Sequence, residues 1–178
     1  MNAANRAKHV VAALTGADPH PAFAAKMRTP FAVLGIRTGG GAVIGIEYLP
    51  ADEPPLAPQD AIARRAVGQL ERYLADPHFR FTLPLAPAGT AFRQQVWQAL
   101  LRIPVGESRT YGELARELHT APRAVGGACG ANPIALVIPC HRVVGSHGSL
   151  GGFMNATAGD PLAIKRWLLR HEGYRFGA

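Results

Sequence analysis

Cysteine, lysine and long hydrophobic runs are all scarce in this sequence. Its 178 residues include only two cysteines, Cys129 and Cys140. Two cysteines are too few for a disulfide framework, and they suit a reducing compartment where a thiol stays free. No apolar run approaches the roughly 18 residues of a membrane-spanning helix, and residues 1–16 lack the apolar core and cleavage site of a secretory signal. We therefore expect a cytoplasmic protein without a membrane partner.

The remaining composition is that of a folded globular chain. Hydrophobic residues make up 48% of the sequence, which excludes global disorder. The 20 glycines and 15 prolines follow no three-residue repeat, which excludes collagen. A chain of this length buries roughly 70% of its unfolded surface on folding, so it needs no stabilising metal or disulfide. The length suits one ordinary domain or two small ones.

The charge is basic and unevenly distributed. The chain has 19 lysines and arginines against 12 acidic residues, a net charge of +7. Residues 1–85 carry 9 basic and 7 acidic residues, whereas residues 86–178 carry 10 and 5. The C-terminal half is therefore the better candidate to bind a polyanion such as nucleic acid. A basic surface that only confers solubility is the alternative, and charge alone leaves both open.

The first half of the chain predicts a small sheet with one helix. Residues 31–37 and 42–48 have strand character and flank three consecutive glycines, Gly39 to Gly41, which is typical of a hairpin. Apolar residues recur at helical spacing over 60–74, and residues 79–83 predict a short strand that returns to the hairpin. We expect residues 1–28 to be a partly ordered lead-in and 84–90 a linker. An N-terminal α/β domain then spans residues 1–85.

The second half, residues 86–178, predicts a mainly helical domain. Thr90 and Thr110 can cap helices over 91–102 and 111–118, and Pro122 suits the start of another over 123–130. The short break at 119–121 gives the latter two helices the outline of a helix-turn-helix. Residues 145–161 predict a loop and residues 161–171 a final helix. The predicted fold class is therefore α+β.

The predicted helix over 123–130 is unusual because Gly126 and Gly127 are adjacent in it. Each glycine weakens a helix by roughly 1 kcal/mol relative to alanine. Small residues allow close backbone approach, either to another helix or to a nucleic-acid groove. Tight helix packing and groove binding are both open on this observation.

Cys140 and His141 are the strongest local signal for chemistry. A thiol reacts as its thiolate, which a nearby base can generate, and the base needs a third group to orient its ring. Glu172 is a candidate for that third group, and a bridging water can link the cysteine to the histidine. The alternative is that Cys140 is a buried small hydrophobic residue, which is how we interpret Cys129.

The sequence offers no comparable pattern for other kinds of site. The seven histidines are dispersed, and none is spaced with a cysteine as a pair of metal ligands would be, so no metal site is predicted. The glycines over 145–152 lack the Lys-Ser/Thr of a phosphate-binding loop. Arg142 lies too close to Cys140 for the thiol-phosphate loop of a phosphatase.

Several segments of the second half resemble the O6-alkylguanine-DNA alkyltransferases, also called methylated-DNA–protein-cysteine methyltransferases. IPCHRVV at 138–144 resembles their active-site signature, and RAVGGA at 123–128 with NP at 132–133 resembles their DNA-recognition helix and asparagine hinge. TY at 110–111 is similar to their helix-turn-helix entry, and KRWLL at 165–169 with HEG at 171–173 to their closing helix. The likeness spans about residues 90–175. The first half resembles a ribonuclease H-like fold in outline.

The resemblance implies a DNA-repair protein that acts once. Duplex DNA would be bound, O6-alkylguanine (with O4-alkylthymine as a second substrate) would be flipped out, and Cys140 would attack the alkyl carbon to leave a permanent thioether. By the same resemblance, Glu172 orients His141, which deprotonates Cys140 through a water. Tyr111 protonates the departing guanine and helps rotate the 3′ phosphate, and Asn132 holds the hinge. No cofactor is implied.

The resemblance also implies DNA contacts and a substrate pocket. Arg123 would fill the gap in the base stack, and its helix would enter the minor groove. The other implied DNA contacts are Tyr111, Ala124, Gly126, Gly127, Arg93 and Ser146. The implied pocket residues are Phe153, Met154, Val143 and Pro139, with the loop 155–161 at its border. Phe153 and Met154 stand where many relatives have tyrosine and a small residue. The expected partner is double-stranded DNA containing O6-alkylguanine, bound by a monomer with no obligate protein partner.

Two other functions compete with alkyl transfer. A non-catalytic sensor of alkylated guanine would bind the same DNA, but the related sensors replace the cysteine that this chain keeps at position 140. A cysteine hydrolase would turn over repeatedly, whereas an alkyl acceptor reacts once per molecule. The presence of Cys140 favours transfer to the protein itself.

Overall fold

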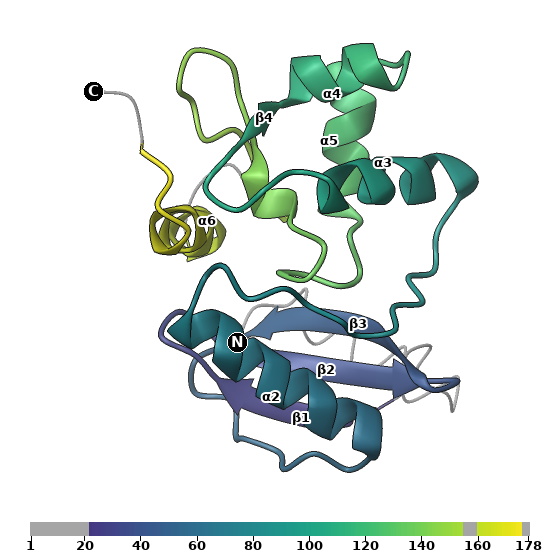
Figure 1. Cartoon of the computed structure of the whole chain (residues 1–178), viewed down its shortest axis with the longest axis vertical. Helices are drawn as coiled ribbons and strands as arrows, with labels where there is room; N and C mark the ends of the chain where they lie inside the picture. Colours follow the sequence, from purple (N-terminus) through teal and green to yellow (C-terminus); the bar gives the residue numbers. More distant parts are fainter. Residues whose placement is uncertain (1–21, 155–159, 176–178) are drawn as a thin grey trace, which may run out of the picture.

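The computed structural model describes residues 22–154 and 160–175, which form an α+β fold with a small sheet and five helices (Figure 1). The sheet layer consists of β1 (Ala25–Arg28), β2 (Val33–Gly39), β3 (Ala42–Leu49) and α2 (Ala61–Ala75). The helical layer holds α3 (Ala91–Leu101), α4 (Tyr111–Glu117), α5 (Pro122–Gly130) and α6 (Asp160–His171), with the short strands β4 (Arg109–Thr110) and β5 (Val143–Val144) and the 3₁₀ turn η1 (Cys140–Arg142). The predicted α+β class is confirmed.

The three strands of the sheet layer form an antiparallel meander in the order β1-β2-β3. The predicted hairpin is present, and its turn uses Gly40 and Gly41 at φ values of 56° and 78°, which glycine adopts without strain. The predicted lead-in over 1–28 is wrong where β1 lies, because residues 25–28 pair with β2 along their whole length. Residues 1–21 of that lead-in lie outside the described residues.

The short strand predicted over 79–83 is also wrong. The side chain of Gln69 on α2 satisfies the backbone of this segment, because its Oε1 accepts from Thr82 N at 2.8 Å. A strand ladder is therefore not needed to pair that N–H group. The segment meets the sheet only beyond this point, in an isolated bridge between Val43 and Leu85.

Helix α2 lies across one face of the sheet (Figure 1). Asp60 caps its first turn by accepting from Ala63 N at 2.7 Å. The buried side of the helix includes Ala66, Leu70 and Tyr73, which recur at the spacing of one helical face. This face closes the core of the sheet layer and brings Tyr73 toward the C-terminal end of α6, where its ring lies 5.3 Å from that of His171.

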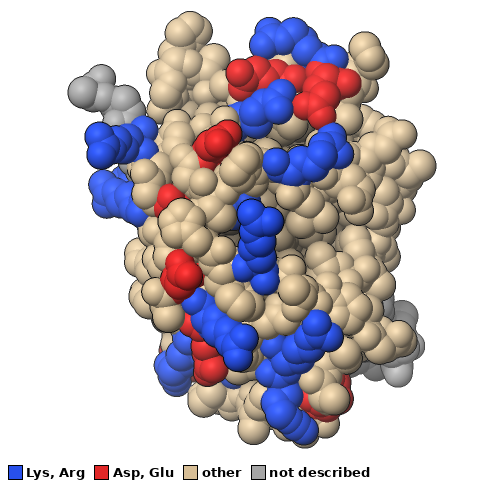
Figure 2. Space-filling model, viewed as in Figure 1, with Lys and Arg blue, Asp and Glu red and all other residues tan. Residues whose placement is uncertain are grey.

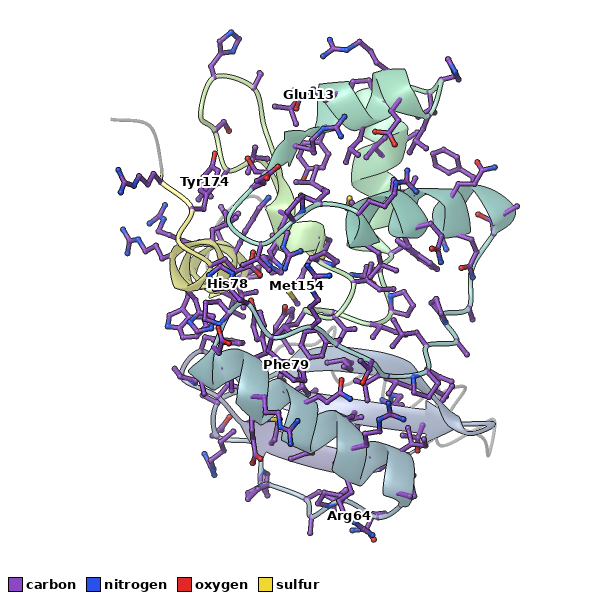
Figure 3. The ribbon with its side chains drawn as sticks, in the orientation of Figure 1. Arg64, His78, Phe79, Glu113, Met154 and Tyr174 are labelled. Carbon is purple, nitrogen blue, oxygen red and sulfur yellow. The ribbon has the colours of Figure 1, made fainter. Side chains whose placement is uncertain are left out.

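The helices of the helical layer begin where the capping residues predict. Thr90 caps α3, and Thr110 forms a reciprocal capping box with Glu113, which is labelled beside α4 in Figure 3. Pro122 occupies the first turn of α5, where a missing N–H group costs nothing. Of the helices in the described part of the chain, none has both the length and the apolar character to cross a lipid bilayer.

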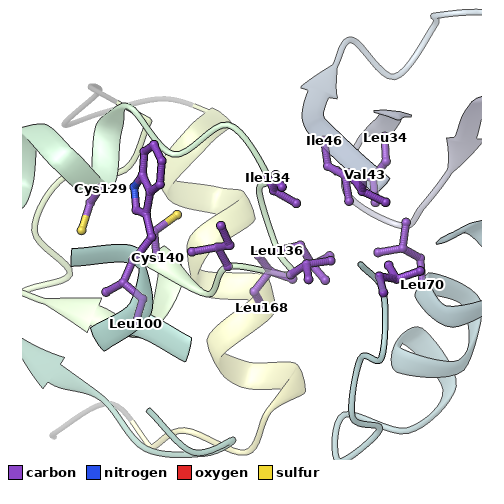
Figure 4. Packing of buried hydrophobic residues seen from close by; sticks show 14 of the residues in the cluster. Leu34, Val43, Ile46, Leu70, Leu100, Cys129, Ile134, Leu136, Cys140 and Leu168 are labelled. Carbon is purple, nitrogen blue, oxygen red and sulfur yellow. The ribbon is translucent and has the colours of Figure 1, made fainter. Parts of the chain in front are cut away.

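The two layers share one hydrophobic core. Ile46 of β3 donates to Pro133 O at 2.8 Å and accepts from Ala135 N at 3.0 Å, so the sheet edge holds the segment that leads to Cys140. Figure 4 shows this contact region, with Ile134 and Leu136 facing Leu34, Val43 and Ile46. The position of the segment before η1 therefore depends on the sheet layer as well as on the helices.

Candidate active site

A pocket of about 510 Å³ opens beside α5 in the helical layer. Cys140 lines it and is 5% exposed, so its sulfur is buried but borders an open space. Small residues of α5 form much of the wall, and aromatic and sulfur-containing side chains form the rest. The full lining is Tyr111, Pro122, Arg123, Gly126, Gly127, Cys129, Gly130, Cys140, Gly152, Phe153 and Met154.

Asn132, just after α5, fixes the position of Cys140. Its Nδ2 donates to Ile138 O at 2.8 Å and to Cys140 Sγ at 3.4 Å, and its Oδ1 accepts from Ile134 N at 3.0 Å. These bonds hold the buried turn over 134–138 and present the sulfur on η1 toward the pocket. The amide thus joins the end of α5 to the sulfur directly.

Glu172 is the centre of a cluster of hydrogen-bonded polar side chains that includes His141, the neighbour of Cys140 in the chain. Its Oε1 lies 2.9 Å from His141 Nε2, and Arg142 donates to both carboxylate oxygens at 2.9 Å. Tyr73, from α2, donates to the same Oε1 at 2.8 Å. Burial alone would raise the pKa of Glu172, but the bonds and charges of His141 and Arg142 outweigh it and hold that pKa far below its usual range. The group is therefore a carboxylate at neutral pH.

This carboxylate sets the proton positions on His141. The Glu172 carboxylate can only accept a hydrogen bond from His141 Nε2. That nitrogen therefore carries the proton, and His141 Nδ1 offers a lone pair. Burial lowers the pKa of His141, and the partial compensation by Glu172 does not reverse the shift, so the ring is neutral. Its Nδ1 is buried and has no hydrogen-bond partner within the protein. His141 is thus an oriented neutral base.

The thiol of Cys140 is protonated in the resting protein. Burial raises its pKa, while the bond from Asn132 and the charge of Lys165 lower it in part. A thiol in this state needs a base to become a nucleophile. The adjacent imidazole, backed by a buried carboxylate, is built for that task.

The sequence matches known proteins over the part of the chain that builds this site. Residues 91–174 match the family described as 6-O-methylguanine DNA methyltransferase, DNA binding domain. A methylated-DNA–protein-cysteine methyltransferase of Methanosarcina acetivorans is 48% identical over 112 residues, which cover 62% of this chain and 69% of that protein. The chain belongs to the methylated-DNA–protein-cysteine methyltransferase family.

Further members of the methyltransferase family agree with this assignment. The protein of that name from Salmonella typhimurium is 52% identical over 95 residues, which cover 52% of this chain and 53% of that protein. The crystal structure of Mycobacterium tuberculosis OGT in complex with DNA superposes with a TM-score of 0.71 at 38% identity. That match covers 83% of this chain and 90% of the other, so the likeness includes the sheet layer.

Lys165 supports the pocket wall of this methyltransferase family member. Its side chain on α6 is fully buried, and Nζ donates to Val143 O and Leu150 O at 2.6 Å and to Gly152 O at 2.9 Å. Burial lowers the pKa of Lys165 to about 8, against the opposing effect of the cysteines. The three carbonyl bonds tie β5 and the loop over 150–152 to α6.

Tyr111 forms another part of the pocket wall. Its hydroxyl donates to Gly152 O at 2.9 Å, the same oxygen that accepts from Lys165. Gly151 adopts φ 66°, and a Cβ there would come within 2.7 Å of the Tyr111 ring, so only glycine fits. Burial raises the pKa of Tyr111 far above its usual range, so the hydroxyl is protonated in the resting protein.

The remaining predicted DNA contacts lie partly at the pocket and partly away from it. Arg123, Gly126 and Gly127 line the pocket from α5, and Ala124 lies beside them on the same helix. Arg93, in the exposed first turn of α3, and Ser146, in the exposed turn over 146–149, do not line it. On the face shown in Figure 2, basic side chains are scattered among acidic ones, so a charged patch does not by itself mark a binding surface there.

Two predicted pocket residues line the cavity and two do not. Phe153 is buried and Met154 is 38% exposed, and both contribute to the wall; Figure 3 labels Met154. Pro139 instead lines a second cavity of about 590 Å³ next to Arg142, because the backbone turns at η1. Val143 is fully buried in β5 and faces the core, while its carbonyl accepts from Lys165. Residues 155–159 of the predicted bordering loop lie outside the described residues.

Sequence reasoning missed Tyr73 and undervalued both Lys165 and Cys129. Tyr73 follows Ala66 and Leu70 at helical spacing, which signals burial but not its bond to Glu172, 99 residues away. Lys165 is one of only three lysines in an arginine-rich chain, and that rarity was the available signal. Cys129 is buried as predicted, yet it also borders the pocket. Among the described residues, no group of three or more His, Cys, Asp or Glu side chains could hold a metal ion.

Proposed function

We propose that this protein repairs alkylated DNA by transferring the alkyl group of O6-alkylguanine, and of O4-alkylthymine, to its own Cys140. One observation carries the proposal: the sulfur of Cys140 borders the open pocket while the neighbouring His141 is held by the buried Glu172 at 2.9 Å. The names of the relatives, methylated-DNA–protein-cysteine methyltransferases, agree with this chemistry. The DNA complex of Mycobacterium tuberculosis OGT supports duplex DNA as the partner.

The reaction begins with a proton transfer. The thiol proton of Cys140 passes through a water to His141 Nδ1, and the imidazolium that forms is stabilised by the Glu172 carboxylate. The thiolate then attacks the alkyl carbon, so that a sulfur–carbon bond forms while the carbon–O6 bond breaks. The electron pair of the broken bond leaves with guanine, which takes a proton from Tyr111. The thioether has no leaving group that the site could activate, so each molecule reacts once.

Helices α4 and α5 act as a helix-turn-helix that docks in the minor groove. The exposed Gly127 and the partly exposed Gly126 let the backbone of α5 approach the DNA closely, and Ala124 adds little bulk. Arg123, exposed at the pocket, enters the base stack where the alkylated base leaves it. Arg93 and Ser146, outside the pocket, contact phosphates and strengthen binding without reading sequence.

The flipped base enters the pocket between Tyr111 and the loop over 152–154. Phe153 packs against the base, and Met154 borders the alkyl group, whereas Pro139 and Val143 have no part in this wall.

The sheet layer is a ribonuclease H-like domain over residues 1–85, and residues 86–178 form the alkyl-acceptor domain. The protein acts as a monomer without a cofactor or an obligate partner, in a reducing cytoplasm where Cys140 stays a thiol.

A sensor that only binds alkylated guanine is the alternative function. It needs the pocket and Arg123 but has no use for an oriented base beside a thiol. The buried contacts among His141, Arg142 and Glu172 therefore favour the transfer reaction over simple binding.

Intact-mass spectrometry after incubation with a methylguanine duplex tests the proposal. We expect one added methyl group per molecule, mapped to Cys140 by peptide analysis and lost in Cys140→Ser. Cys129→Ser is the matched control, because it changes the other pocket thiol and should still accept one methyl group. A product yield above the amount of protein, or DNA binding without any mass gain, would contradict the proposal.

A further inference from the structure

Two buried side-chain atoms in the described part of the chain have no hydrogen-bond partner: His141 Nδ1 and Tyr48 Oη. A buried polar group left unpaired costs roughly 1–3 kcal/mol, and ordered water is the usual partner where the protein supplies none. The first atom belongs to the proton relay proposed above. Tyr48 comes from the sheet layer, and nothing in that relay accounts for its hydroxyl.

Several contacts direct Tyr48 toward the active site. It lies on β3 two residues after Ile46, whose backbone holds the segment over 133–135 that leads to Cys140. The Tyr48 ring lies 5.9 Å from that of Phe153, which lines the pocket with Cys140. Burial raises the pKa of Tyr48 well above its usual value, and the charges of Cys140 and Glu172 raise it further. The hydroxyl therefore shares the buried interior of the protein with both groups.

Packing does not account for the hydroxyl. The ring of Tyr48 sits between Phe31, at 6.1 Å, and Phe153. A phenylalanine would fill this aromatic site without burying a polar atom, and would avoid the cost of desolvating the hydroxyl. The buried hydroxyl of Tyr48 therefore lowers the stability of the fold unless it has a hydrogen-bond partner.

We propose that Tyr48 is a positioning residue for alkyl transfer, whose hydroxyl donates a hydrogen bond to the buried water that links Cys140 Sγ to His141 Nδ1. This inference rests on the proposed function and extends the active site into the sheet layer. The thiol proton goes to the water, and the water gives one of its own protons to Nδ1. Tyr48 keeps its proton throughout and holds the water oxygen in line between the sulfur and the ring.

The titratable and charged groups around the proposed relay come from η1, α2 and α6. Cys140, His141 and Arg142 come from η1, and Glu172 follows α6. Tyr73 comes from α2 and donates to Glu172 Oε1 at 2.8 Å. Lys165 of α6 lowers the pKa of Cys140 by its charge and donates to Gly152 O in the pocket wall. Loss of the Tyr48 hydroxyl leaves every one of these groups in place, which makes it a clean probe of the water.

The first experiment compares Tyr48→Phe with Tyr174→Phe, which makes the same chemical change outside the pocket. Cys140 in the full chain is labelled with iodoacetamide across a pH series without DNA, and labelling is followed by mass spectrometry. Single-turnover methyl transfer from a methylguanine duplex and urea unfolding are measured on the same proteins. We expect Tyr48→Phe to slow both reactions about tenfold, which corresponds to one lost hydrogen bond, and to move the labelling profile to higher pH. Tyr174→Phe should leave both reaction rates at the wild-type value.

The outcomes separate this inference from the proposed function. If Tyr48→Phe changes labelling while even the wild type accepts no methyl group from DNA, the role of Tyr48 stands and the proposed function fails. If Tyr48→Phe folds, gains stability and reacts at the wild-type rate in both assays, the hydroxyl is passive and the inference is overturned. A high-resolution crystal structure of the wild type provides a test that does not depend on the variant folding. A water within hydrogen-bond distance of both Tyr48 Oη and His141 Nδ1 supports the inference, and a site without one refutes it.

Discussion

The side-chain amide of Asn132 donates to the sulfur of Cys140 across 3.4 Å. Asn132 comes directly after the last turn of α5, so the helix proposed to enter DNA and the nucleophile are joined through a single side chain. The same amide nitrogen also holds Ile138 O at 2.8 Å. A shift of α5 on DNA binding would therefore change the hydrogen bond from Asn132 to the sulfur of Cys140.

Replacing Asn132 should separate the rate of transfer from stability. A serine in Asn132→Ser can still accept from Ile134 N, as short hydroxyl side chains do in turns, but cannot reach Cys140. We expect about 1 kcal/mol of lost stability and a roughly tenfold slower single-turnover transfer, because a hydrogen bond to the forming thiolate is lost. Asn132→Ala should destabilise further, since Ile134 N is then left unpaired. Transfer at the wild-type rate in Asn132→Ser would show that the amide contributes only to folding.

The pH dependence of stability should report on Glu172. Its pKa in the folded protein is depressed below the ordinary 4.5, so its contribution to stability is complete above that pH and is lost as the pH falls below it. Glu172→Gln removes the buried charge that pairs with the partly buried Arg142, which should cost about 3 kcal/mol near pH 7. The difference in the free energy of urea unfolding between wild type and Glu172→Gln should become smaller as the pH falls toward 3. A difference in unfolding free energy that stays constant with pH would mean that the charge of Glu172 does not contribute to stability.

Arg123 should matter for duplex DNA and not for the chemistry itself. Its exposed side chain lies at the pocket on α5, while the relay from His141 to Glu172 lies in the buried cluster. We expect Arg123→Ala to slow methyl transfer from a duplex at least about tenfold, because the gap in the base stack is no longer filled, with little effect on transfer from free methylguanine. Arg123→Lys keeps the charge and tests whether attraction to phosphate suffices. Equal losses on both substrates would remove Arg123 from base flipping.

Met154 should limit the size of the alkyl group. It is one of the few exposed large hydrophobic side chains in the described residues, and it lines the pocket beside Phe153. Met154→Ser widens this wall, so the rate for a benzyl group relative to methyl should rise about tenfold, the usual scale for a change of one or two methylenes in a pocket. The measurement is competition between benzylguanine and methylguanine duplexes. An unchanged ratio would place the alkyl group elsewhere in the pocket.

Local chemistry made the helices predictable from the sequence. Thr90, Thr110 and Pro122 act within one turn of their own positions, so the starts of α3, α4 and α5 follow from neighbouring residues. The hairpin follows equally from its glycines. Strand β1 escaped prediction because a four-residue strand has too short a pattern, and its pairing with β2 is a tertiary event.

Cys140, His141 and Glu172 were all visible as candidates in the sequence, since their residue types and local order suggest their chemistry. Only the fold decided that Glu172 is charged and that His141 is neutral. The pKa of each group depends on its burial and on nearby charges, and segments far apart in the chain determine both of these. The contributions of Tyr73, Lys165 and Tyr48 likewise arise from packing between α2, α6 and β3. A sequence specifies which groups are available, whereas desolvation and distance, which exist only in the folded chain, determine what those groups can do.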